Sequence, residues 1–202
     1  IVYVLGAVAL DVRLPAGTDP DALQRALDRV VARHAALRTS YVVRDGEPVR
    51  RVDPDGRVRI SHEPAPAPGV PLRDQLADAA TERFDLAHGP LVRARLWPDA
   101  EPGGAVLLLV VHHIVADFWS LSLIVDELAR CYRAELTGTD PALPPAGDYA
   151  DFVARQHRYA AGPAGQAAAA FWHARLRGPL PVLELPTDRP RPPVSSHRSG
   201  RM

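Results

Sequence analysis

Two adjacent histidines followed by an aspartate are the residues whose types and spacing best suit chemistry. His112 and His113 follow an apolar run that begins at Ala105, and Asp117 stands just before a helical pattern. Imidazole has an unperturbed pKa of about 6.5, so it can take up and return a proton near neutral pH. A buried carboxylate needs a cation or several N–H groups, so Asp117 could orient a histidine or pair with an arginine. The spacing therefore allows an acid-base site at the end of a strand.

The two histidines cannot have the same role if the strand is regular. Successive side chains of a strand point to opposite faces, so only one ring can face a given cavity. We expect one of them, His112 or His113, to pack in the core and donate a ring N–H to a backbone carbonyl. The other can face a site. From the residues alone, a core histidine and a catalytic histidine both stay open.

Two other uses of the same residues are less consistent with the sequence. His112, His113 and Asp117 could supply a facial metal triad, but they lack the i, i+4 spacing of helical zinc ligands and have no fixed third partner. We therefore expect no bound metal. His112 and Asp117 also match the His-x-x-x-x-Asp pattern of glycerolipid acyltransferases. No phosphate-binding box and no membrane-facing segment accompany that pattern.

The apolar run from Ala105 does not alternate, which predicts a strand buried on both faces. Around it the sequence predicts strands and helices in mixed order, which favours an α/β sandwich. We expect strands over 1–14, 37–44, 47–52, 57–62 and 91–97, and helices over 20–36, 72–84, 119–136, 149–159 and 166–176.

Composition excludes several classes of function. The 24 basic residues, all arginine, balance 24 acidic residues, so no basic field invites nucleic acid. No apolar stretch is long enough for a membrane helix, and we expect a cytoplasmic protein. The single cysteine, Cys131, is interpreted as a small core residue. The chain begins at Ile1 without a methionine, so we expect a piece of a longer protein.

Several ordered segments resemble the motifs of one family. The residues from His112 to Ser120 resemble the His-His-x-x-x-Asp-Gly motif of condensation domains in nonribosomal peptide synthetases, including its Trp-Ser continuation. Further segments follow the order of that family's other motifs: Arg33-His34-x-x-Leu37-Arg38-Thr39-x-Tyr41, Phe84-Asp85-Leu86 with Gly89-Pro90-Leu91-x-Arg93, Tyr149-x-Asp151-Phe152, and Phe171-Trp172 followed by 185–192. The chain is identified as a member of this family by resemblance over nearly its whole length.

The resemblance implies a fold like that of chloramphenicol acetyltransferase. In that fold two similar α/β lobes form a V, and the reaction takes place in a tunnel between them. Residues 1–202 would be the N-terminal lobe only, with a mixed sheet and helices packed on it. We expect this lobe to be truncated at its start and to lack the second lobe, with a proline-rich exit segment over 178–202.

The resemblance also assigns roles to individual residues. His113 would be catalytic, as a general base or as a hydrogen-bond partner of the tetrahedral intermediate. His112 would support it structurally, and Asp117 would form a salt bridge with Arg33 or Arg38, a choice that the residues leave open. Two further residues are assigned to the substrate tunnel: Phe118, which stands where the family has glycine, and Trp119, which is interpreted as packing in the loop.

The implied activity is an acyl transfer in secondary-metabolite biosynthesis. A condensation domain joins acyl and aminoacyl groups by an amide or ester bond, so the chain would belong to an acyltransferase. The isolated fragment is expected to be inactive. No cofactor is expected on the chain, because its substrates would be carried on phosphopantetheine. Carrier proteins, the second lobe and neighbouring synthetase domains are the expected partners. The alternative is a condensation-like domain that is not catalytic and only docks carrier proteins or recruits partners.

Overall fold

The computed structural model describes residues 2–4, 6–99, 102–183, 186 and 190. Its main sheet has the strand order β1-β2-β7-β6-β5, with bounds β1 Val2–Val4, β2 Ala7–Leu14, β5 Ile60–His62, β6 Val92–Pro98 and β7 Ala105–His112. Strand β5 pairs with β6 in parallel, whereas the other neighbours are antiparallel. The sheet is therefore mixed. A separate hairpin joins β3 Thr39–Arg44 to β4 Glu47–Val52.

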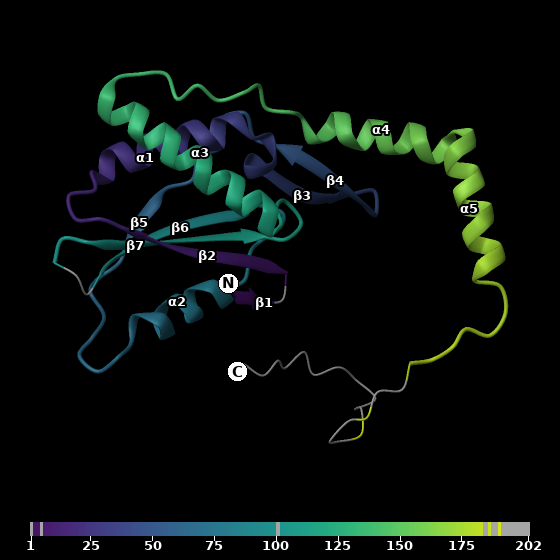
Figure 1. The fold of residues 1–202 in the computed structure, drawn as a ribbon, viewed down its shortest axis with the longest axis horizontal. Helices are drawn as coiled ribbons and strands as arrows, with labels where there is room; N and C mark the ends of the chain where they lie inside the picture. The colour runs from purple at the N-terminus through teal and green to yellow at the C-terminus, as the bar shows by residue number, and fades with distance from the viewer. Residues whose placement is uncertain (1, 5, 100–101, 184–185, 187–189, 191–202) are drawn as a thin grey trace. The chain divides into compact units, whose positions relative to one another are not determined.

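Helices cover both faces of the sheet (Figure 1). Helices α1 (Pro20–Arg33) and α3 (Phe118–Thr137) lie side by side on one face, and α2 (Leu72–Thr81) lies on the other. Ion pairs also join α1 to α3, because Glu135 binds Arg25 and Arg29. The expected sandwich of a mixed sheet and packed helices is confirmed.

Strand β7 lies at the centre of the sheet, and its six inner residues are buried. Its alternate side chains divide between two apolar clusters. Leu107, Leu109 and Val111 pack with the cluster under α1 and α3, whereas Leu108 and Val110 pack with the cluster under α2. Burial on both faces explains why the run does not alternate in polarity. A strand held in this way gives the residues at its end a fixed position.

Three of the differences between the expected and the observed boundaries have a local cause. The expected strand over 1–14 is two antiparallel strands, because the chain turns at Gly6, whose φ is +80°. The helix expected to reach residue 36 ends at Arg33, since the extended backbone of His34 caps it, and a 3₁₀ turn over Ala35–Arg38 follows. Helix α2 ends at Thr81, because Glu82 is extended.

Residues 149–202 form a second compact unit, which is described by itself. It contains α4 (Tyr149–Ala161) and α5 (Pro163–Arg175), whose large apolar side chains are mostly exposed. Most of the expected exit segment, 178–202, lies outside the described residues. None of the described helices is long and apolar enough to span a membrane.

Candidate active site

The turn that follows β7 is held by hydrogen bonds from three parts of the chain. The N–H of His113 donates to the carbonyl of Gly6 at 2.6 Å, and the N–H of Val115 donates to the carbonyl of His112 at 3.0 Å. From the β3–β4 hairpin, the hydroxyl of Tyr41 lies 3.4 Å from the carbonyl oxygen of Ile114. The backbone that carries both histidines is thus anchored on the β1–β2 turn and on β3.

His112 contacts the backbone of the turn through its ring. Its ring is half-buried, and its Nδ1 accepts a hydrogen bond from the backbone N–H of Ile114 at 3.1 Å. The expected donation to a backbone carbonyl is not among the contacts of its ring. Since Nδ1 accepts, a neutral His112 carries its hydrogen on Nε2. Burial lowers the pKa of His112, and the neighbouring His113 lowers it further, so the acceptor form is favoured.

The ring of His112 is enclosed by two neighbours. The rings of Phe84 and His112 form a T-shaped pair with 5.9 Å between ring centroids and planes at 88°. On another side lies Gly6, where a Cβ atom would stand 2.9 Å from Nε2 of His112. The close approach and the positive φ of Gly6 both require glycine at this position.

His113 is exposed, directly after the last residue of β7. Asp117 begins α3 as its N-cap, and its carboxylate accepts from the backbone N–H of Ser120 at 2.8 Å and from the Ser120 hydroxyl at 2.6 Å. These hydrogen bonds, the hydroxyl first, lower the pKa of Asp117, and the charge of His113 adds a smaller lowering. Asp117 therefore stays ionised and interacts with His113 electrostatically.

Neither of the two arginines expected to pair with Asp117 does so. Arg33 binds Glu127 on α3 at 3.2 Å, and His34 approaches the same carboxylate at 2.6 Å. The guanidinium of Arg38 donates to the carbonyls at the end of α1 and to those of the turn after β4. The physical reason is that other acceptors already hold both guanidinium groups: Glu127 and the carbonyl of Pro144 for Arg33, and backbone carbonyls for Arg38. Both arginines support the fold close to the site and do not contact it.

The two residues assigned to the tunnel are both partly exposed in the first unit. Phe118 keeps 38% of its surface accessible and Trp119 keeps 72%, so Trp119 is not packed in the loop as expected. Phe118 is the first residue of α3 and does not have a positive φ. The special backbone freedom of glycine is therefore not needed at position 118, and the phenyl ring occupies space beside the histidine turn.

Several contributors to the site received no role from sequence reasoning: Gly6, Tyr41, Phe84 and Ser120. All of them except Gly6 lie in segments that resemble the family's motifs. That resemblance could have pointed to them. Gly6 gave none beyond a glycine inside an expected strand. No group of three or more metal-ligating side chains occurs among the residues that the structure describes.

Comparison with known proteins decides the family. Residues 7–202 match the family described as the condensation domain. The chain belongs to the condensation domain family. It is 40% identical over 195 residues to a linear gramicidin synthase protein from Brevibacillus parabrevis, and the match covers 93% of this chain and 2% of that synthase protein.

Solved structures of condensation-like domains share the fold. The X-domain from teicoplanin biosynthesis matches with a TM-score of 0.79 and 29% identity, over 95% of this chain and 43% of that one. The epimerization domain from the third module of tyrocidine synthetase B matches with a TM-score of 0.73 and 26% identity, over 89% of this chain and 42% of that one. This condensation-domain chain thus has the chloramphenicol acetyltransferase-like fold and spans less than half of either neighbour.

Proposed function

We propose that this chain is the first lobe of an active condensation domain. The domain forms an amide or ester bond between an acyl group and an aminoacyl group on two carrier proteins, with His113 as its catalytic residue. One observation carries the proposal: His113 is exposed at the end of a rigid buried strand, whereas His112 beside it is committed to the backbone of the turn. The chain offers one histidine for the structure and one for the reaction.

In the amide-forming reaction, the nitrogen of the aminoacyl group attacks the carbonyl carbon of the acyl thioester. The C–N bond forms, the C–S bond breaks, and the phosphopantetheine thiol leaves. His113 takes the proton from the attacking nitrogen and returns it to the leaving sulfur, or it donates a hydrogen bond to the oxyanion of the intermediate. Asp117 is the carboxylate that interacts electrostatically with His113 at the end of β7.

The substrates reach the site on phosphopantetheine, which condensation domains use as their substrate carrier. The proposed partners are an upstream and a downstream carrier protein and the second lobe, which supplies the other wall of the tunnel. Without that wall the 202-residue chain is proposed to be inactive. The exposed rings of Phe118 and Trp119 are proposed to line this chain's side of the tunnel, since the described residues of the first unit do not bury them.

A domain that only docks partners is the second candidate, and one observation favours it. The X-domain from teicoplanin biosynthesis, whose fold this chain shares, has been solved in a complex with OxyB, so a condensation-like domain can serve as a docking surface. The two candidates differ in their need for His113. Docking does not require an exposed imidazole at the end of β7, whereas condensation does.

The test is His113→Ala in a full-length condensation domain that carries this chain, assayed with loaded carrier proteins. Loss of a general base costs about 10²–10⁴-fold in rate, and the melting temperature should not change, because the side chain is exposed. His62→Ala is the matched control, since His62 is also exposed and ends β5 of the same sheet. Product formation by His113→Ala at the rate of the His62→Ala control would remove His113 from the reaction and favour docking.

A further inference from the structure

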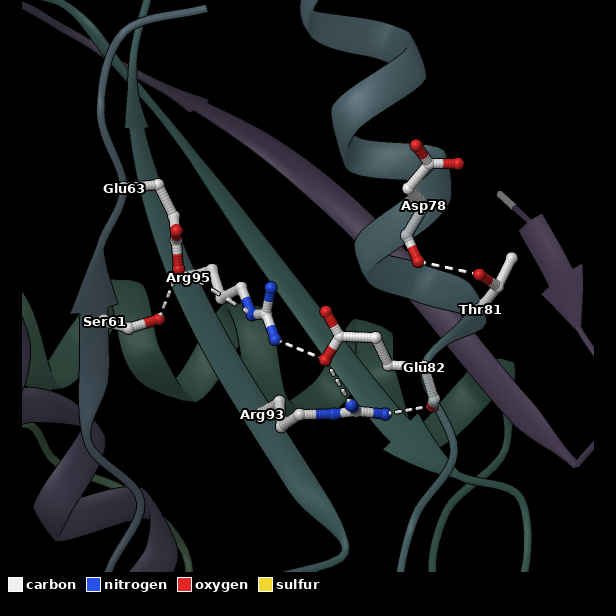
Figure 2. Close-up of polar contacts among 7 residues, drawn as sticks. All are labelled: Ser61, Glu63, Asp78, Thr81, Glu82, Arg93 and Arg95. Carbon is white, nitrogen blue, oxygen red and sulfur yellow. Dashed lines mark hydrogen bonds and ion pairs between the residues drawn. The ribbon is translucent and has the colours of Figure 1, made fainter.

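Arg93 makes several contacts on the α2 side of the sheet, and its side chain is 21% exposed. Its guanidinium binds the carboxylate of Glu82 at 2.8 Å and also donates to the backbone carbonyl of Glu82, as Figure 2 shows. Its Nε is buried and has no hydrogen-bond partner among the described residues. A buried donor without a partner carries a free-energy cost, so another contact must favour this position of the side chain.

That contact is the ring of Phe84. The guanidinium carbon of Arg93 lies over the ring, 3.8 Å from its centroid, as in a cation–π contact. The same ring forms a T-shaped pair with the ring of His112. A continuous set of contacts therefore runs from Glu82 through Arg93 and Phe84 to His112. Because Arg93 binds both the carboxylate and the carbonyl of Glu82, it also holds the backbone just before Phe84.

The position of His112 matters because its ring supports the turn. Nδ1 of His112 must face the N–H of Ile114, and Gly6 leaves no room for the ring to move toward the β1–β2 turn. Phe84 closes another side. If Phe84 moved, the imidazole could rotate away from Ile114, and the turn that carries His113 would lose its internal acceptor.

We infer that Arg93 and Phe84 are positioning residues for His113, acting through the ring of His112. The inference rests on the proposed role of His113 in condensation. It gives two residues a role in the reaction without proposing that they contact the substrate. Phe84 lies in the segment after α2, and Arg93 lies on β6.

The charges around this set are nearly balanced. Arg95 also binds Glu82 and lies 3.8 Å from Glu63, so two cations face two carboxylates. Asp78 on α2 turns its carboxylate away from them (Figure 2). The electrostatic effect on the pKa of His112 comes from His113. Arg93 thus holds Phe84 by its position over the ring.

Arg95 provides a matched control. It lies two residues along the same strand, points to the same face, shares Glu82 and is exposed to a similar extent, 23% against 21% for the side chain of Arg93. It has no contact with Phe84 among the ring contacts of the described residues. Arg93→Met and Arg95→Met each remove a Glu82 ion pair, but only the first removes the cation over Phe84. Phe84→Leu removes the ring, whereas Phe84→Tyr retains it.

The experiment measures kcat and KM of a full-length condensation domain carrying this chain, together with the ring titration of His112 by ¹⁵N-histidine NMR. We expect Arg93→Met and Phe84→Leu to lower kcat by about 10- to 100-fold with KM unchanged, since a displacement of about 1 Å can cost about 10²-fold. In both variants the pKa of His112 should rise toward its ordinary value as its ring gains water. Phe84→Tyr and Arg95→Met should stay close to the unsubstituted protein in both measurements.

Equal losses in Arg93→Met and Arg95→Met, or in Phe84→Leu and Phe84→Tyr, would overturn the inference, because they would reflect stability alone. An unchanged His112 titration in Arg93→Met and Phe84→Leu would also overturn it. If the unsubstituted domain forms no product, the proposed function fails. The His112 titration then still decides whether Arg93 and Phe84 hold the ring.

Discussion

Replacement of Gly6 by alanine tests whether the β1–β2 turn holds the site. Gly6 has a φ of +80°, and a Cβ atom there would lie 2.9 Å from Nε2 of His112. The ring cannot simply swing aside, because its Nδ1 accepts from Ile114 and the ring of Phe84 packs against it in a T-shaped pair. Gly6→Ala therefore combines a backbone cost with a steric cost.

The two costs can be estimated separately. An alanine in the left-handed region costs about 1–2 kcal/mol. Displacing the His112 ring from its rotamer costs a further ~0.5–1.5 kcal/mol. The free energy of unfolding should thus fall by about 1.5–3.5 kcal/mol. For a chain of this size, each kcal/mol of lost stability lowers the melting temperature by about 2–4 °C. The loss is therefore easily measured by calorimetry.

Gly17→Ala is the control, because Gly17 has the same φ of +80° and nothing within 4 Å of its Cβ position. It should show the backbone cost alone. Adding His112→Ala to Gly6→Ala should recover the steric part, giving a coupling of about 1 kcal/mol in a double-mutant cycle. If Gly6→Ala and Gly17→Ala lower the stability equally, Gly6 does not position His112 and the reasoning is wrong.

Three further predictions concern the loop and its two ends. Asp117→Ala removes the N-cap of α3 and should cost about 1 kcal/mol by urea denaturation. Because the fold lowers the Asp117 pKa, that cost should be complete above pH ~4 and fade as pH falls through the folded-state value; a constant cost would contradict it. Since burial lowers the pKa of His112, the unfolded chain binds the proton first, and stability should fall below pH ~6.5. His112→Asn, which keeps an acceptor but does not titrate, should reduce this fall, and an identical pH profile would exclude His112 as the cause. In a full-length domain, Phe118→Gly should widen the range of accepted aminoacyl groups, measured by competition between small and bulky carriers; an unchanged ratio would show that the ring only packs.

The sequence by itself determined the elements and the residues with chemical potential. The run before His112 had to be a buried strand, because seven apolar residues without alternation have no solvent face. Asp117 and Gly138 mark the two ends of α3 as its N-cap and C-cap. Both caps are local features, because the N-cap hydrogen bond and the left-handed C-cap depend on adjacent residues. Alternation also predicted that the two histidines differ in role, and the half-buried His112 beside the exposed His113 agrees with it.

Only the tertiary structure decided which side chains meet at the end of β7. Arg33 pairs with Glu127 across the α1–α3 contact, a partner set by helix packing and not by sequence distance. The contacts from Arg93 to Phe84 to His112 join a strand, a post-helix segment and a strand end. Periodicity and capping act within a few residues, whereas these contacts depend on how β6, β7 and α2 come together in the sheet, which no local pattern specifies.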